Sequence, residues 1–320
     1  MVEADDVEAA VRRMAGWADV QLTITPITTG ITNQNFRVDL AGDGPYVVRI
    51  PGERTEVLGI DRSCEAEATR RAAQLGIAPG VRGELPGYGT LVTEFVPGRQ
   101  AEPEDLHDPD RLAVVVGLLR RFHDSGPISW QFPIFRVVEW HARDAVTHGV
   151  SLPAAYDDAH RVASQIETAF ADRSTAARPC HNDLLPANVL FGAERAWLID
   201  FEYAGMNDPY FDLANLSVNC GLDAAGDDRL LSCYFDSDGA TAPAAVGRLN
   251  LMKIMSELRE GMWGAVQQGI SKLTTIDFAE YAARHLDQAI ALARMPEFDR
   301  WLSAARAGDE PKGPSPARVD

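Results

Sequence analysis

The chain of 320 residues is 46% hydrophobic and 24% charged, the composition of a globular protein long enough to bury a sizeable core. Its net charge of −17 disfavours nucleic acid and anionic membrane as partners, since both are polyanions, and suits either a cationic substrate or simple solubility. The N-terminus has no basic segment followed by an apolar core, and no apolar run reaches the roughly 20 residues of a membrane span, so we expect a cytoplasmic protein.

The first third of the sequence predicts mostly strands. A short helix with apolar residues at helical spacing opens the chain between Val7 and Met14. Runs rich in β-branched and aromatic residues follow, and a helix capped by Asp61 or Ser63 runs to about Leu75. The five strand-like runs cover residues 20–27, 35–40, 45–50, 80–85 and 89–95.

After Pro97 and Gly98 the pattern becomes helical. Two short apolar runs at 189–191 and 196–199 predict a small hairpin between helices. Apolar positions at helical spacing recur over 109–123, 153–171, 243–268 and 275–294. We therefore predict an α+β fold with a small β-rich N-terminal lobe over 1–96, a larger mainly helical lobe over 97–307 and a disordered tail over 308–320.

The most informative motif is the segment HNDLLPAN at residues 181–188. It fits the pattern H-x-D-x-x-x-x-N of a kinase catalytic loop. In that chemistry an aspartate accepts the proton of the attacking hydroxyl, and an asparagine further along the loop reaches a magnesium ion on the phosphates. We assign these roles to Asp183 and Asn188, and expect His181 to brace the loop.

A second aspartate, Asp200, ends the short apolar run that follows this loop. It occupies the place of the aspartate in the kinase motif D-F-G, which bridges magnesium to the β- and γ-phosphates. A lone aspartate after a strand is most often a cap or turn residue, but here two motifs occur in the expected order. They predict ATP and Mg²⁺ as cofactors, with Asp183, Asn188 and Asp200 as catalytic groups and the last two as metal ligands.

The N-terminal lobe should supply the grip on ATP. Arg49 is the single cation in the apolar strand YVVRI, where protein kinases place a lysine, and its planar fork suits phosphate. An exposed strand charge is the alternative. Glu65 on the next helix is our first choice to orient Arg49, with Glu67 second. A polar loop at 28–35 lies between two predicted strands; it is either an ordinary hairpin loop or a phosphate-binding loop containing Thr29, Gly30, Thr32, Asn33 and Asn35.

The sequence TEFVPG at 93–98 ends the last strand of the first lobe. In a bilobal kinase this linker presents backbone groups to adenine. By position, the carbonyl of Glu94 and the N–H of Val96 are the candidates for that contact. The alternative is an ordinary linker, which the sequence by itself does not distinguish.

These motifs resemble the choline/ethanolamine kinase family, in the aminoglycoside-phosphotransferase-like branch of the protein-kinase-like fold. The resemblance implies the bilobal kinase-like architecture, with Asp183 as catalytic aspartate and with Asn188 and Asp200 on magnesium. Glu202 and Asp212 match charged positions that support the catalytic region, and helix capping is an alternative role for Asp212. The matching stretches are TGITNQNFRV (29–38), YVVRI (46–50), CHNDLLPANVLF (180–191) and LIDFEYAGMNDPYFDLAN (198–215).

The resemblance is weakest on the substrate side. The family holds a trimethylammonium group in a partly aromatic pocket by cation–π attraction. The segment SELREGMWGAVQ (256–267) resembles the family's late helix, which carries two tryptophans three apart; here Trp263 is present and Glu260 takes the other position. A carboxylate there still favours a cation, such as a primary amine or a larger amino alcohol, while Trp263 is alternatively a core aromatic. The substrate-binding candidates are Glu202, Glu260 and Trp263.

Two function hypotheses remain open at this stage. The first is an ATP-dependent kinase for the hydroxyl of a cationic amino alcohol of the choline or ethanolamine type. The second is a kinase of the same fold for an aminoglycoside, an amino sugar or a similar hydroxyl compound. A catalytically silent nucleotide-binding protein is disfavoured because every catalytic group is present, and a protein kinase because no long activation segment fits between Asp200 and Asp212. We expect a monomer or homodimer with no nucleic acid or membrane partner.

Overall fold

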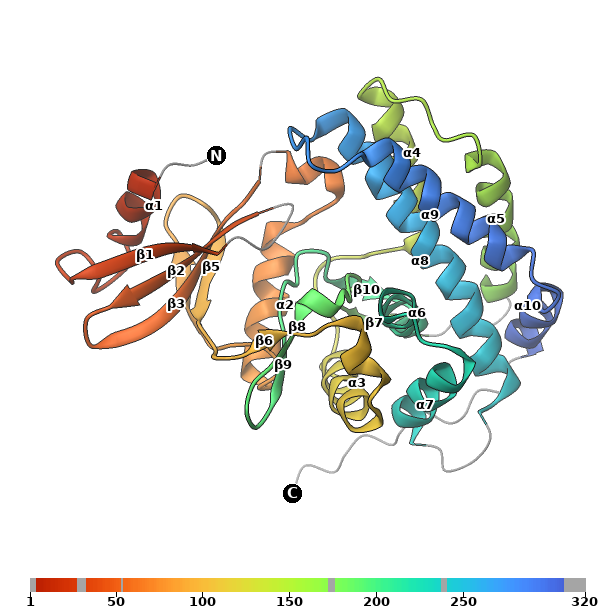
Figure 1. Ribbon diagram of the computed structural model, residues 1–320, viewed down its shortest axis with the longest axis horizontal. Helices are drawn as coiled ribbons and strands as arrows, with labels where there is room; N and C mark the ends of the chain where they lie inside the picture. The colour runs from red at the N-terminus through yellow and green to blue at the C-terminus, as the bar shows by residue number, and fades with distance from the viewer. Residues whose placement is uncertain (1–3, 28–32, 53, 172–175, 237–240, 308–320) are drawn as a thin grey trace.

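The computed structural model describes residues 4–27, 33–52, 54–171, 176–236 and 241–307. Most of the predicted phosphate loop, 28–32, and the predicted disordered tail, 308–320, therefore lie outside the described residues. Within the described ranges, no helix has the length and apolar character to cross a membrane. The chain folds as α+β, with an antiparallel sheet followed by a mainly helical body (Figure 1).

A five-stranded antiparallel sheet forms the N-terminal part, in the order β1-β2-β3-β5-β4. Buried and less buried residues alternate along β2 and β3, because successive side chains of a strand point to opposite faces. Val38 and Val48 join Val7 and Val11 of helix α1 (Ala4–Val11) and Trp17 in a separate small core. All five predicted strands are present: β1 (Leu22–Ile27), β2 (Gln34–Leu40), β3 (Asp43–Ile50), β4 (Val81–Leu85) and β5 (Thr90–Glu94).

Helix α2 (Arg62–Gln74) lies between the sheet and the body (Figure 1). Its N-cap is Asp61, whose carboxylate accepts a hydrogen bond from the Cys64 N–H at 2.7 Å. The helix ends before Gly76, whose φ of 65° suits glycine. A 3₁₀ turn, η1 (Thr55–Leu58), precedes the cap. This start places Glu65 in the first turn of α2, where it faces β3.

The helical body is built around α8 (Pro243–Ile270), whose side chains are buried on every face over most of its length. Buried charges on α8 are paired, as Lys253 is with Asp227 and Glu257 with His285, which is the usual condition for burying them. Helices α4, α6, α9 and α10 pack on α8. The helices of the body besides α8 are α3 (Pro109–His123), α4 (Ile134–Thr147), α5 (Tyr156–Ala171), α6 (Pro209–Cys220), α7 (Ala224–Phe235), α9 (Phe278–Ala293) and α10 (Phe298–Ala307).

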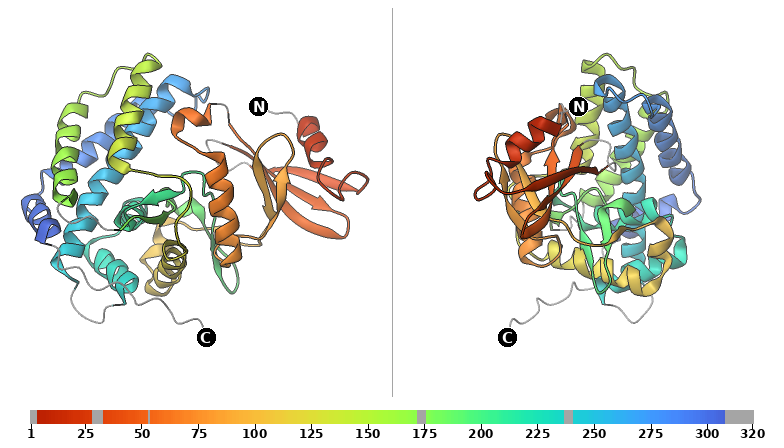
Figure 2. Two further views of the ribbon diagram at one scale, coloured as in Figure 1. Left: turned by 180° about the vertical axis from the view of Figure 1, so that it is seen from behind. Right: turned by 60° about the vertical axis from the view of Figure 1, so that its left-hand side comes forward.

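Two glycines allow α9 to approach α8 closely; the two helices lie side by side when the molecule is seen from behind (Figure 2). A Cβ atom added to Gly261 would lie 2.1 Å from Leu286 Cδ1, and one added to Gly264 would lie 2.7 Å from Tyr281 Cδ1. A side chain at either position would require these α9 side chains to move, and the α9 backbone at Ala282 also lies close, 3.1 Å from the Cβ added at Gly261. The close approach brings Tyr281 of α9 beside Glu260 of α8.

Short ladders connect the sheet to the helices. Strands β8 (Val189–Phe191) and β9 (Ala196–Leu198) form the predicted hairpin, and β6 (Arg99–Gln100) pairs with β8. Strand β7 (Arg178–Cys180) pairs with β10 (Gly205–Asn207). Two further 3₁₀ turns, η2 (Pro103–His107) and η3 (Pro186–Asn188), lie in this region. The ladders keep the segment at 181–188 close to Asp200.

The structure also departs from the sequence-based expectations. It contains α4, α6, α7 and α10, which we did not predict, and the helices expected to begin at 153 and 275 begin at Tyr156 and Phe278. Helix α6 is buried on nearly all sides, so its sequence has no one-sided apolar pattern. Helix α4 does have that pattern, and its omission was an error. The boundary between residues 96 and 97 stays a prediction.

Candidate active site

The loop at 181–188 is held by Asp212 of α6. The Asp212 carboxylate accepts hydrogen bonds from the backbone N–H groups of His181 and Asn182, each at 2.7 Å, and lies 2.9 Å from His123 Nε2. Asn182 has a φ of 63°, in the left-handed region that asparagine tolerates better than most residues. One buried carboxylate thus fixes the backbone just before Asp183.

Asp183 extends from this loop into a cavity and is 9% exposed. Asn188 Nδ2 donates a hydrogen bond to the Asp183 carbonyl at 2.8 Å, and Arg259 Nη1 lies 3.3 Å from Asp183 Oδ1. Burial raises the pKa of Asp183 to about 8; Arg259 opposes this shift, while Glu260 and Asp200 add to it. The carboxylate therefore holds a proton far more strongly than an exposed aspartate does, which suits a general base near neutral pH.

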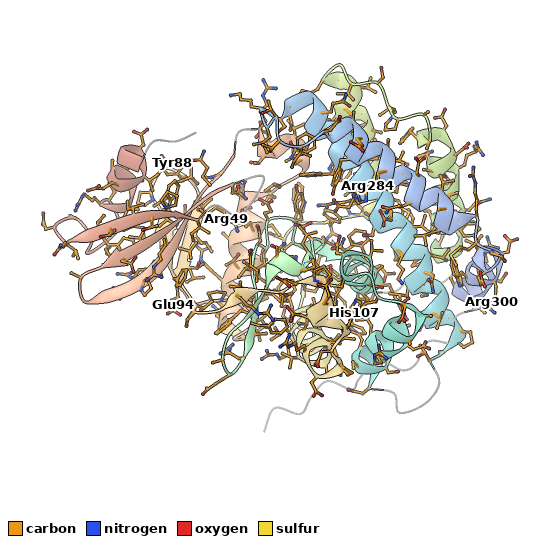
Figure 3. All side chains as sticks on the ribbon, in the orientation of Figure 1. Arg49, Tyr88, Glu94, His107, Arg284 and Arg300 are labelled. Carbon is orange, nitrogen blue, oxygen red and sulfur yellow. The ribbon has the colours of Figure 1, made fainter. Side chains whose placement is uncertain are left out.

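Asp200 follows β9 with a φ of 68°, a conformation that is strained for a residue other than glycine. His181 Nε2 lies 2.9 Å from the Ile199 carbonyl, so the loop at 181–188 contacts the backbone just before Asp200. Arg49 Nη1 of β3 lies 2.6 Å from Asp200 Oδ1. Figure 3 shows Arg49 between the sheet and the helical body, where this ion pair joins the two.

Glu65 lies between two arginines. Its Oε1 is 3.3 Å from Arg49 Nη1, and its Oε2 is 2.5 Å from Arg62 Nη1. Glu67, our second choice for this contact, pairs instead with Arg71 at 3.1 Å. Of the two candidates, the structure therefore places Glu65 beside Arg49.

Glu202 is 4% exposed and contacts Asn33, just before β2, and Arg62 of α2. Its Oε2 accepts a hydrogen bond from Asn33 Nδ2 at 2.9 Å and lies 3.7 Å from Arg62. Burial raises the pKa of Glu202 to about 7, with Asp200 adding to the shift and Arg49 opposing it. These contacts place Glu202 with the groups around Arg49.

A cavity of about 800 Å³ lies between the sheet and the helical body, within the size range of small-molecule sites. Thr29, Gly30 and Thr32 lie outside the described residues. Every other residue predicted for the site lines this cavity: Asn33, Asn35, Arg49, Glu65, Glu94, Val96, Asp183, Asn188, Asp200, Glu202, Glu260 and Trp263.

The end of β5 and the residues that follow it line the cavity on the sheet side. The Glu94 N–H donates a hydrogen bond to the Gly80 carbonyl at 2.7 Å, and a Cβ added to Gly80 would lie 2.6 Å from the Glu94 carboxyl carbon. Figure 3 shows Glu94 at the lower edge of the sheet. Phe95 and Val96 continue this wall towards β6. The predicted adenine contacts therefore lie at the edge of the cavity that the sheet builds.

The other end of the cavity is aromatic and charged. Trp263 Nε1 donates a hydrogen bond to the Tyr203 hydroxyl at 2.9 Å, and the Tyr281 hydroxyl donates one to Glu260 Oε2 at 2.8 Å. Arg259 pairs with Glu260, and its guanidinium carbon lies 4.4 Å from the centre of the Tyr203 ring. We call Tyr203, Arg259, Glu260, Trp263 and Tyr281 the aromatic end.

Three residues of the aromatic end were not among the sequence candidates. Arg259 is the neighbour of Glu260, and Tyr203 closely follows Asp200, so local signals for both existed. Tyr281 had no such signal, because only the packing of α9 on α8 brings it to the cavity.

Comparisons with known proteins show the family and the fold of this chain. A family model described as the phosphotransferase enzyme family matches residues 23–247. A solved choline/ethanolamine kinase family protein from Mesorhizobium loti is 34% identical, with 95% of this chain and 99% of that chain covered and a TM-score of 0.81. The protein LicA of Haemophilus influenzae is 28% identical over 276 residues, which is 82% of this chain and 78% of that protein. An aminoglycoside 2′-phosphotransferase shares the fold, with a TM-score of 0.60 at 14% identity over 91% of this chain and 98% of that one.

The kinase-like fold around one cavity, together with these relatives, makes this a phosphotransferase that uses an alcohol group as acceptor. The chain belongs to the phosphotransferase enzyme family, on its choline/ethanolamine kinase branch.

Proposed function

We propose that this enzyme is an ATP- and Mg²⁺-dependent kinase that transfers the γ-phosphoryl group to the hydroxyl of a small cationic amino alcohol. The observation that carries the proposal is the convergence of Asp183, Asn188 and Asp200 on one cavity that has Arg49 on its sheet side and the aromatic end on the other. This arrangement supports a nucleotide on the sheet side, an acceptor at the aromatic end and phosphoryl transfer between them. Among the relatives, several are choline kinases or ethanolamine kinases.

The donor groups in the middle of the cavity fit a magnesium ion. Mg²⁺ prefers carboxylate and amide oxygens, often with only one or two protein ligands. Asn188 has its Nδ2 engaged with the Asp183 carbonyl, which leaves its amide oxygen for a cation, and Asp200 adds a carboxylate. Asn188 and Asp200 are therefore the proposed metal ligands. The ion, when bound, neutralises charge on the β- and γ-phosphates.

The nucleotide is assigned to the sheet side. A LicA protein of this fold has been solved in complex with AMP, which supports nucleotide binding here. Arg49, held by Glu65, presents a guanidinium suited to phosphate oxygens. Asn33 and Asn35 line the cavity on the same side, and the segment from Glu94 to Val96 is the proposed adenine wall.

Asp183 is the proposed general base. Its carboxylate accepts the hydrogen of the acceptor hydroxyl, keeps the oxygen in line with the phosphorus and takes the proton as the O–P bond forms. Arg259 and Asn188 fix the position of this carboxylate from two sides. Glu260 and Trp263 are assigned to the cationic part of the acceptor, since a carboxylate and an aromatic ring both attract a cation.

The first experiment is coupled ADP release with ATP and Mg²⁺ across choline, ethanolamine, other amino alcohols and several aminoglycosides. Turnover is expected with choline or ethanolamine, and Asp183→Asn is expected to lower kcat by roughly a hundredfold or more, because a general base contributes about that much. Leu75→Ser, at an exposed position at the end of α2, is a control that should leave kcat unchanged.

Each alternative result has a clear meaning. Turnover with aminoglycosides or sugars alone would keep the transfer mechanism and replace the acceptor. Full activity of Asp183→Asn would remove the proposed base. No turnover with any acceptor, together with tight ATP binding, would support a nucleotide-binding protein instead of a kinase.

A further inference from the structure

Arg259 lies at the aromatic end and is 1% exposed. Its Nη1 contacts Glu260 and lies 3.3 Å from Asp183 Oδ1, while its guanidinium carbon is 4.4 Å from the centre of the Tyr203 ring. One buried guanidinium therefore pairs with two carboxylates and covers a face of an aromatic ring. It takes the position over that ring which a cationic ligand would otherwise occupy.

The second tyrosine of the aromatic end is engaged in the same way. The guanidinium carbon of Arg284 lies 5.3 Å from the centre of the Tyr281 ring, and the His285 ring centre lies 4.3 Å from it. Trp263 meets Tyr281 at an interplanar angle of 64°, with ring centres 5.8 Å apart. A quaternary ammonium group binds to the faces of aromatic rings. The aromatic end therefore offers such a group fewer free ring faces than an open aromatic cage does.

The carboxylates favour a different kind of cation. Glu260 Oε1 is in contact with Arg259, and Glu260 Oε2 accepts a hydrogen bond from the Tyr281 hydroxyl. Each of these oxygens has a further lone pair that can accept a hydrogen bond from another N–H group, and the Asp183 carboxylate can accept one as well. A primary ammonium group carries such donors, whereas a trimethylammonium group carries none. A hydrogen bond to a charged group increases binding affinity by roughly tenfold or more.

We propose that Arg259 determines the acceptor preference of this enzyme, selecting a hydroxyl compound with a primary ammonium group over its trimethylated analogue. The inference rests on the proposed function and narrows its substrate class. Arg259 acts in two ways: it covers the Tyr203 face that would attract methylated nitrogen, and its charge repels a cation that has no N–H with which to reach Glu260.

The test is the ratio of kcat/KM for ethanolamine to kcat/KM for choline. The wild type is expected to prefer ethanolamine by roughly tenfold or more. Arg259→Met keeps the apolar part of the side chain and exposes the Tyr203 ring, so the ratio should move towards choline by roughly tenfold. Arg259→Lys keeps a cation over the ring and should hold the ratio within roughly threefold of the wild type.

Arg248→Met is the matched control. Arg248 lies on the same helix, is also 1% exposed and has its guanidinium carbon 4.7 Å from the centre of the Phe170 ring, but it does not line the cavity. Loss of a buried guanidinium and its ring contact is thus common to both variants. A change of ratio in Arg259→Met alone would support selection by Arg259, and the same change in both would overturn it.

Two results separate this inference from the proposed function. Equal kcat/KM for the two amines in the wild type, or an unchanged ratio in Arg259→Met, would overturn the role of Arg259 and leave the kinase activity standing. Turnover of neither amine, nor of any other amino alcohol, by the wild type would remove both. If Arg259→Met does not fold, Glu260→Gln replaces it: loss of the carboxylate should reduce the ethanolamine preference roughly tenfold, and an unchanged ratio would count against the proposal.

Discussion

Asp183 lies where its ionised form is poorly solvated, and this makes a prediction about pH. Burial raises the pKa of Asp183 to about 8, and in its proposed role as general base Asp183 works only when it is ionised. We expect kcat/KM for the acceptor to be low in acid and to rise with pH. The midpoint of the rise should lie at or below about pH 8, because a cation bound near Asp183 lowers the pKa of its carboxyl group. The measurement is kcat/KM between about pH 5.5 and pH 9 at saturating ATP.

A neighbouring carboxylate provides the matched variant for this profile. The charge of Glu260 contributes to the raised pKa of Asp183, so Glu260→Gln should move the acidic limb to lower pH. Asp236→Asn, at the exposed end of α7, should leave the limb in place. A limb that moves to higher pH in Glu260→Gln, or does not move, would contradict this account of Asp183.

At the residue scale, the convergence of the proposed transfer groups on one cavity was predictable, and the aromatic end was predictable only in part. Asp183, Asn188 and Asp200 are brought together by a short loop and a hairpin, so their chemistry is visible as spacing in the sequence. Arg259 and Tyr281 acquire their roles from the packing of α8 against its neighbours. No local pattern reports such a contact, because it depends on helices that are distant in the chain.

At the element scale, the packing of α9 on α8 depends on Gly261. A methyl group there would lie 2.1 Å from Leu286 Cδ1 and 3.1 Å from the Ala282 carbonyl oxygen, so Gly261→Ala should displace Leu286 and press on the α9 backbone. We expect the free energy of unfolding to fall by about 1–3 kcal/mol, as in other overpacked cores. The KM for the acceptor should rise as well, because Tyr281 moves with α9. Urea denaturation and acceptor titration measure the two effects.

Gly117 of α3 supplies the control, because a Cβ added there meets nothing within 4 Å. Glycine inside a helix is about 0.8–1 kcal/mol less favourable than alanine, so Gly117→Ala should stabilise the protein by about that amount. If Gly261→Ala were also stabilising, helix propensity would outweigh the contact with α9, and the packing argument would be wrong.

Strands were easier to predict than buried helices, for a physical reason. Strands β2 and β3 have one buried face, so the alternation of apolar and polar residues along the sequence predicts them directly. Helix α6 is buried nearly all round and has no polar face to contrast with its apolar one. Its Asp212, which holds the catalytic loop, could therefore be given a supporting role only through the family resemblance.

At the scale of the whole molecule, the cavity is lined by both the sheet and the helical body, so a ligand that contacts both should stabilise the fold. Mg²⁺ and ADP together, at about 100 times their dissociation constant, should add about 2.7 kcal/mol to the free energy of unfolding. For a chain of this size we expect a rise in Tm of roughly 5 °C. Thermal denaturation with ADP, with and without Mg²⁺, measures it.

Two carboxylate variants separate metal binding from transfer. Asp200→Asn should abolish the Mg²⁺-dependent part of the rise in Tm, because Asp200 is a proposed ligand. Asp183→Asn should retain it, because Asp183 is assigned to the acceptor hydroxyl. Equal loss in both variants would mean that the metal site had been assigned to the wrong residues.

The order of the two halves could be predicted from composition, whereas their contact could not. A β-rich first third and a helical remainder are visible in the sequence, and the kinase-like arrangement came from the motifs. The ion pair between Arg49 and Asp200, which spans the two halves, joins residues far apart in the chain. Its partners could be named in advance as site residues, but not as partners of each other.

The architecture of α8 has a consequence for how such enzymes diversify. Arg259, Glu260 and Trp263 lie within two turns of one buried helix, whereas the transfer groups lie on a separate loop and hairpin. Under the proposed assignments, substitutions at a few positions of this helix change which alcohol is accepted while the proposed transfer groups stay as they are. Gene duplication followed by drift on α8 is then a short route to a new acceptor, and a library restricted to those three codons is the matching laboratory route.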